Sequence, residues 1–71
     1  MSSDNRYRAC VVGLGSMGMG AARSCLAAGL ATYGADLNPA ACQALTEAGA
    51  VAAGPDASAF AGELDAVLLL L

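Results

Sequence analysis

Three glycines, at positions 13, 15 and 18, narrow the possible folds of this chain more than any other part of its sequence. They form the string Gly13-Leu14-Gly15-Ser16-Met17-Gly18, with the spacing G-x-G-x-x-G. The string ends an apolar run, residues 7–14, which predicts a buried strand, and opens a segment rich in Ala, Met and Leu, residues 16–28, which predicts a helix. Glycines at this spacing between a strand and a helix are typical of the first turn of a β-α-β unit.

The rest of the chain continues the alternation of strand and helix. Residues 31–35 predict a second strand, and Asn38-Pro39 is a strong helix start for residues 40–48. Residues 50–53 predict a weak third strand, and a short helix is expected through Phe60 and Ala61. The apolar run 66–71 predicts a central parallel strand covered on both faces. The order β-α-β-α-β-α-β predicts an α/β fold with a parallel sheet, the N-terminal part of a Rossmann dinucleotide-binding domain.

The boundaries of the chain suggest a partial domain. Residues 1–6 are polar and are expected to be a disordered lead-in, and residues 7–71 are expected to be a partial dinucleotide-binding Rossmann domain. The composition is 58% hydrophobic but only 4% aromatic and 13% charged, so many small apolar residues need cover from elsewhere. The sequence also stops inside the last apolar run. We therefore expect a piece of a larger α/β protein.

Each glycine of the string has a physical reason to be there. Gly13 allows a tight turn out of the strand, Gly15 lets the backbone approach a pyrophosphate, and Gly18 lets the helix pack closely on the sheet. Unpaired amides around residues 15–17, helped by the helix dipole, are expected to bind the phosphates of a dinucleotide. A plain turn remains the alternative for the glycines. Ser16 either binds phosphate or satisfies the helix start, and Met17 either contacts cofactor or fills the core, as Met19 is expected to do.

Asp36 is the expected ribose ligand. It follows the second predicted strand, at about the expected 20 residues after the glycines, where a carboxylate can accept the hydroxyl protons of the adenosine ribose. The same charge repels a 2′-phosphate, and no Lys or Arg follows to attract one, so the sequence favours NAD over NADP. The alternative is that Asp36 only serves a turn or a cap. The predicted cofactor-binding residues are Gly13, Leu14, Gly15, Ser16, Met17, Gly18, Asp36, Leu37 and Asn38.

Charge and cysteine content disfavour several other classes of protein. The net charge is −3 and the only cations are Arg6, Arg8 and Arg23, whereas nucleic-acid binding needs clustered positive charge. No stretch reaches the roughly 18 apolar residues of a membrane span. The three cysteines are scattered and there is no histidine, so no metal site is expected. An odd number of separated cysteines suits buried thiols in a reducing cytoplasm.

The segment Val11-Val12-Gly13-Leu14-Gly15-Ser16-Met17-Gly18 resembles the N-terminal signature of the beta-hydroxyacid dehydrogenase family. That family includes 3-hydroxyisobutyrate and tartronate semialdehyde dehydrogenases and relatives of 6-phosphogluconate dehydrogenase. Asp36-Leu37-Asn38-Pro39 is similar to the family's NAD-type ribose-binding segment. The resemblance covers about residues 9–71. Ala21 and Ser24 stand where the family usually has Met and Asn, and residues 18–22, 28–30 and 34–38 are nearer the branch that oxidises L-threonate.

The resemblance implies a parent enzyme that oxidises a 3-hydroxy acid by hydride transfer to NAD. It also implies a lysine in a later helical domain and a serine-glycine loop for the substrate carboxylate, but this chain has no lysine and stops before either. We therefore expect no catalytic residue here, a small-molecule hydroxy acid as the substrate of the parent, and a homo-oligomeric parent. Two alternatives remain: a non-catalytic nucleotide-sensing Rossmann module, and an inactive stand-alone piece.

Overall fold

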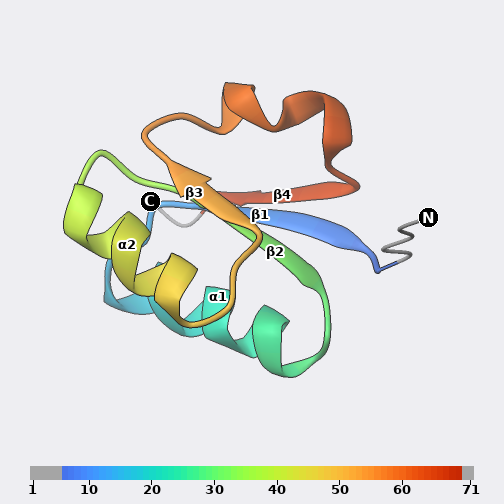
Figure 1. Cartoon of the computed structure of the whole chain (residues 1–71), viewed down its shortest axis with the longest axis horizontal. Helices are drawn as coiled ribbons and strands as arrows, with labels where there is room; N and C mark the ends of the chain where they lie inside the picture. The colour runs from blue at the N-terminus through green and yellow to red at the C-terminus, as the bar shows by residue number, and fades with distance from the viewer. Residues whose placement is uncertain (1–5, 70–71) are drawn as a thin grey trace.

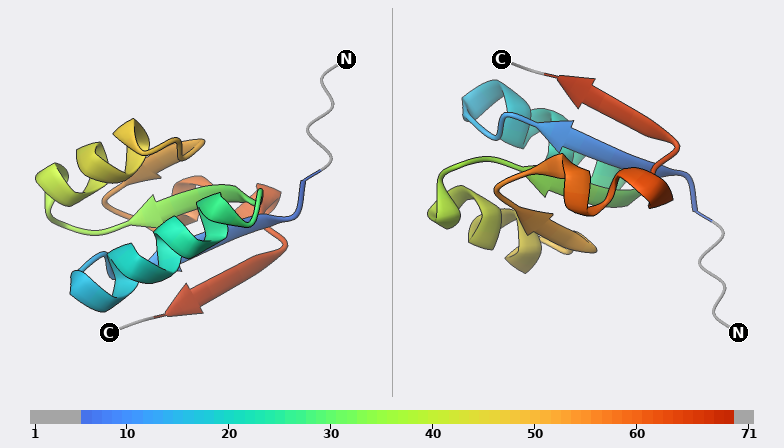
Figure 2. Two further views of the ribbon diagram at one scale, coloured as in Figure 1. Left: turned by 90° about the horizontal axis from the view of Figure 1, so that it is seen from below. Right: turned by 90° about the horizontal axis from the view of Figure 1, so that it is seen from above.

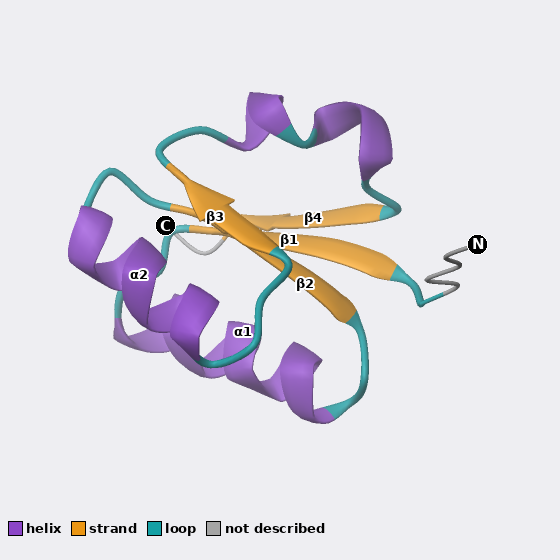
Figure 3. Ribbon diagram, viewed as in Figure 1, coloured by secondary structure: helices purple, strands orange, loops and turns teal. Residues whose placement is uncertain are grey.

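The computed structural model describes residues 6–69, which form a parallel sheet with helices (Figure 1). The expected disordered lead-in, residues 1–6, lies outside the described residues except for Arg6, as do Leu70 and Leu71. The elements in chain order are β1 (Arg8–Val12), α1 (Ser16–Ala27), β2 (Ala31–Ala35), α2 (Pro39–Glu47), β3 (Ala52–Gly54), the 3-10 helices η1 (Ala57–Ala59) and η2 (Ala61–Glu63), and β4 (Ala66–Leu69) (Figure 3).

The sheet has four parallel strands in the order β3-β2-β1-β4. In its centre Cys10 of β1 pairs with Tyr33 of β2 on one side and with Val67 of β4 on the other. The chain moves outward from β1 through β2 to β3 and then returns past β1 to β4. This reversal next to β1 is the topological switch point of a doubly wound sheet, so the predicted α/β class with a parallel sheet is confirmed.

The two faces of the sheet have different cover, as the two views of Figure 2 show. On one face α1 and α2 enclose a core of Val11, Leu14, Ala22, Cys42 and Leu45. On the other face the segment with η1 and η2 packs over a second core of Cys10, Ala31, Tyr33 and Ala35. Alternate residues of β1 point into opposite cores, as the pleat of a strand requires.

Glycines end both helices. At the end of α2, the Gly49 amide donates to the Thr46 carbonyl at 3.1 Å and the Ala50 amide to the Leu45 carbonyl at 3.2 Å. This is a Schellman motif, and Gly49 has the positive φ of 118° that it requires. Because Ala50 takes part in the helix stop, the predicted third strand, residues 50–53, is displaced and β3 begins at Ala52. The end of α1 has the same pair of hydrogen bonds at Gly29 and Leu30.

The prediction of a short third helix through Phe60 and Ala61 is wrong about the type of helix. Two single 3-10 turns replace it, and the side chain of Asp56 begins the first by accepting the Ser58 amide at 2.9 Å. Phe60 separates the two turns and packs its ring on Tyr33, with the ring centroids 5.2 Å apart. The connection keeps its predicted place in the chain order, but it covers the second core with the side chains of Ala57, Phe60 and Leu64 rather than with a regular helical face.

Among residues 6–69 the fourth strand lies at the edge of the sheet. The expectation of a strand covered on both faces is therefore wrong for the described residues, among which β4 pairs only with β1. Val67, Leu68 and Leu69 are exposed, Leu69 to 66%. Within residues 6–69, no helix is long and apolar enough to cross a membrane.

Candidate dinucleotide-binding site

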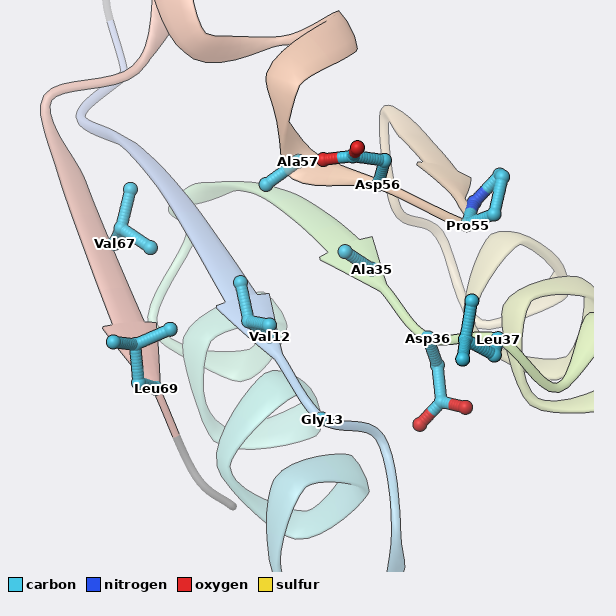
Figure 4. A pocket seen from close by; sticks show the side chains of 10 residues that line it. All are labelled: Val12, Gly13, Ala35, Asp36, Leu37, Pro55, Asp56, Ala57, Val67 and Leu69. Carbon is cyan, nitrogen blue, oxygen red and sulfur yellow. The ribbon is translucent and has the colours of Figure 1, made fainter.

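The candidate site is a cleft at the carboxyl ends of the strands, where open α/β sheets bind their ligands. Its volume is about 500 Å³. Figure 4 shows that its walls come from four parts of the chain: the ends of β1 and β2, the loop after β3, and β4. The lining residues are Val12, Gly13, Ala35, Asp36, Leu37, Pro55, Asp56, Ala57, Val67 and Leu69.

The glycine-rich loop borders this cleft, and Gly13 and Gly18 have the surroundings that the sequence predicted, whereas the approach of a pyrophosphate to Gly15 stays a prediction. Gly13 turns the chain with a φ of 93°, and its amide donates to the Ala35 carbonyl at 2.9 Å. A Cβ on Gly18 would lie 1.6 Å from the Gly13 carbonyl oxygen, so only glycine lets α1 approach this turn. A Cβ on Gly15 would meet nothing within 4 Å. The loop thus packs closely against the protein at Gly18 and leaves open space at Gly15.

The start of α1 offers the donors that a diphosphate needs. Gly15 is the N-cap residue, so no side chain caps the helix, and its first turn contains no acidic residue. The first amides of a helix lack intrahelical partners and carry about half a positive charge. Uncapped amides beside the open space at Gly15 therefore fit a phosphate group.

Asp36 connects this loop with the start of α2. Its Oδ2 accepts the Leu14 amide at 2.6 Å and its Oδ1 accepts the Asn38 amide at 2.8 Å. These hydrogen bonds, that from Asn38 first and that from Leu14 second, lower the pKa of the Asp36 carboxyl, while burial acts in the opposite direction. Asp36 therefore serves the turn before α2, and the alternative that it serves only a turn or a cap stays open. A carboxylate has about four acceptor positions, so two remain for ribose hydroxyls, and the ribose role stays a prediction.

The other predicted residues differ in their exposure. Leu37 and Met17 project from the protein, 86% and 80% exposed, so the alternative that Met17 fills the core is wrong. Met19 packs against the core beneath α1, as expected. The Asn38 side chain accepts the Ala40 amide at 3.0 Å and so caps α2. Nothing is described of the Ser16 side chain, so its two alternatives stay open.

Sequence reasoning missed the far wall of the cleft. Pro55, Asp56 and Ala57 follow β3, and Val67 and Leu69 belong to β4. Asp56 caps η1 and lines the cleft. Their position in the sequence could have indicated the loop residues of this wall, because residues that follow parallel strands meet at one edge of the sheet.

The described residues do not gather into a metal-binding cluster: no three His, Cys, Asp or Glu side chains among residues 6–69 could hold one ion. Cys10 and Cys42 are buried, and burial raises the pKa of the Cys10 thiol. A raised pKa disfavours the thiolate, which is the form that binds metals.

A parallel sheet in this order, with a glycine turn into α1 and a carboxylate after β2, defines a dinucleotide-binding Rossmann domain. Residues 8–71 match the family described as the NAD binding domain of 6-phosphogluconate dehydrogenase, and the chain belongs to this family. NAD is accordingly the cofactor of this domain.

Proteins similar to this chain carry the names of hydroxyacid dehydrogenases. L-threonate dehydrogenase from Escherichia coli O6:H1 is 54% identical over the whole chain, which covers 24% of that protein. The enzyme of the same name from Haemophilus influenzae is 56% identical over 96% of the chain and 23% of its own length. A crystal structure of 3-hydroxyisobutyrate dehydrogenase from Salmonella typhimurium shares 58% identity and a TM-score of 0.90 over 92% of the chain and 23% of its own. The chain spans about a quarter of these relatives, and the expected resemblance to the beta-hydroxyacid dehydrogenases is confirmed.

Proposed function

We propose that the protein containing this chain is an NAD-dependent dehydrogenase that oxidises a 3-hydroxy acid, L-threonate or a similar sugar acid. In this proposal the chain binds the adenosine and diphosphate part of NAD. The glycine loop carries the proposal, because it combines uncapped amides at the start of α1 with open space at Gly15. The names of relatives 52–56% identical to the chain support the choice of substrate class.

The roles proposed for the chain are confined to binding. The amides of residues 15–18 bind the diphosphate, Asp36 accepts hydroxyl protons of the adenosine ribose, and Leu37 lies beside the adenine. When bound, NAD accepts the hydride removed from the substrate. The chain contains no lysine, the residue that the family resemblance assigns to the proton chemistry. We therefore place the catalytic residues and the hydroxy-acid site outside these 71 residues.

The decisive experiment uses the protein expressed from its complete coding sequence. Calorimetric titration with NAD and NADP tests the cofactor, and the increase in NADH absorbance with L-threonate or 3-hydroxyisobutyrate tests the reaction. We expect the protein to bind NAD and to turn over L-threonate faster than 3-hydroxyisobutyrate. Binding without turnover of any hydroxy acid would favour a nucleotide-sensing module, and absence of NAD binding would contradict the whole proposal.

Two further features belong to the proposal. We place the protein in the cytoplasm, because Cys10, Cys25 and Cys42 are all free thiols, as is usual in a reducing compartment. We also propose that the full-length enzyme is a homo-oligomer that binds neither nucleic acid nor membrane. Light scattering of the purified full-length protein, with and without DNA or lipid vesicles, tests the oligomeric state and the absence of binding to nucleic acid and membrane.

A further inference from the structure

Asp36 makes more hydrogen bonds at the carboxyl end of the sheet than the binding of a ribose would require. Its carboxylate accepts one amide of the glycine loop and one at the start of α2. Its own amide donates to the Gly54 carbonyl at the end of β3, at 3.0 Å. Its carbonyl lies 3.3 Å from the Cys42 thiol of α2. One residue therefore links the three loops that surround the cleft.

Leu14 is the point where this link reaches the phosphate-binding loop. Leu14 stands between Gly13 and Gly15, and glycines lose the most conformational freedom on ordering. Its side chain is buried against the core with Leu45, and its amide donates to Asp36 at 2.6 Å. Side chain and amide are thus both fixed, which orders a segment that the flanking glycines would otherwise leave free.

We propose that Asp36 is a positioning residue for the diphosphate as well as a ligand of the ribose: through the Leu14 amide it orders the glycine loop before the cofactor arrives. This inference rests on the proposed function, because it assumes that the loop binds the diphosphate of NAD. It separates two effects of the same carboxylate, one on the sugar and one on the phosphates.

The two effects can be separated with a ligand that has no ribose hydroxyls. ADP contains the adenine, ribose and diphosphate of NAD, whereas 2′,3′-dideoxyadenosine diphosphate lacks both hydroxyls. Asp36→Asn keeps the size of the side chain, but its single oxygen cannot accept both the Leu14 and the Asn38 amides, so one of these two bonds is lost. If Asp36 acted only on the ribose, the variant would bind the dideoxy ligand as well as the wild type, or more tightly because a negative charge is gone.

We expect the opposite result for a positioning residue. Calorimetry on the full-length protein should show Asp36→Asn binding the dideoxy ligand about 3- to 10-fold more weakly, the effect of losing one hydrogen bond. Unchanged or tighter binding of the dideoxy ligand overturns this inference and leaves the proposed function standing. A wild-type protein that binds neither NAD nor ADP overturns both.

Asp65 provides a matched control at the opposite end of β1. Its Oδ2 accepts the Arg8 amide at 2.8 Å, and this bond lowers the pKa of its carboxyl as the amide bonds do for Asp36. Asp65→Asn should therefore lower the melting temperature but leave the affinity for the dideoxy ligand unchanged. Equal weakening by both variants would show a general loss of stability and would overturn the inference.

A measurement on the unmodified protein covers the case in which Asp36→Asn fails to fold. In amide NMR spectra without any ligand, the Leu14 and Asn38 signals should shift together as acid is added, because both amides bind one carboxylate. Their common midpoint should lie below the usual aspartate range. A Leu14 amide that does not respond to this titration overturns the inference.

Discussion

The charge of Asp36 lies where NADP would carry its extra phosphate, if the ribose binds at the end of β2 as proposed. Replacing Asp36 with alanine removes both the acceptor for the ribose hydroxyls and the repulsion of a 2′-phosphate. We expect kcat/KM with NAD to fall about 10-fold or more, the usual effect of losing hydrogen bonds to a charged group, and NADP to be discriminated against less.

The control for this prediction is Asp65→Ala, which removes a carboxylate far from the cleft. Steady-state kinetics with both cofactors should leave its NAD-to-NADP preference as in the wild type. An unchanged preference in Asp36→Ala would show that the carboxylate does not select the cofactor.

The amide-bound carboxylates also predict how stability depends on pH. The pKa values of Asp36 and Asp65 are lowered in the folded protein. Their stabilisation is therefore fully present above the ordinary aspartate pKa of about 3.9 and is lost as the pH falls through the lowered values. Urea denaturation between pH 7 and about pH 3 should show the free energy of unfolding falling in acid, and less steeply in Asp36→Asn and Asp65→Asn. A parallel fall in all three proteins would contradict the assignment.

At the level of elements, α1 contains two glycines with opposite roles. Gly18→Ala places a methyl group against the Gly13 carbonyl, so helix or turn must move. We expect a loss of stability of about 1–3 kcal/mol, typical of overpacking, and weaker NAD binding because the amides of α1 are displaced. Gly20→Ala meets nothing within 4 Å and should add about 1 kcal/mol of stability.

Thermal unfolding and calorimetric NAD titration of both variants check this pair. The result that would contradict it is a Gly18→Ala protein as stable and as tightly binding as Gly20→Ala.

Elements with a strong local signal could be predicted, and those set by tertiary contacts could not. The predicted strand 31–35 is found unchanged as β2, and the Asn38-Pro39 start and the Gly49 stop fix α2 within one residue at each end. The third connection has alanines that favour helix, but Phe60 packs on Tyr33 of another strand and divides the segment into two 3-10 turns. The residues next to Phe60 in the sequence give no indication that its ring packs on Tyr33.

The same limit applies to the cleft. The glycine loop and Asp36 carry recognisable spacing, so the order of the residues along the chain is enough to identify them. Asp56, Val67 and Leu69 line the cleft only because the strand order brings the end of β3 and the edge strand β4 to it. Likewise, nothing in the sequence reveals that Asp36 accepts the Leu14 amide.

For the molecule as a whole, the exposed face and edge of β4 predict that the isolated 71-residue chain folds poorly and aggregates. An uncovered apolar edge strand is a template for association. We expect a broad thermal transition by circular dichroism and aggregates on a sizing column. Leu69→Lys, which adds a charge at the edge, should reduce the aggregation. A cooperative melt of a soluble wild-type monomer would contradict this prediction.

The strand order also bears on how the protein is made. β1 is synthesised first, gains β2 as a neighbour early, and meets β4 only when residues 66–69 have left the ribosome. Until then the side of β1 that later pairs with β4 has unpaired backbone amides and carbonyls, which can bind other unfolded chains. Slow translation between β3 and β4 would therefore prolong the time during which β1, an inner strand of the finished four-stranded sheet, is an unpaired edge.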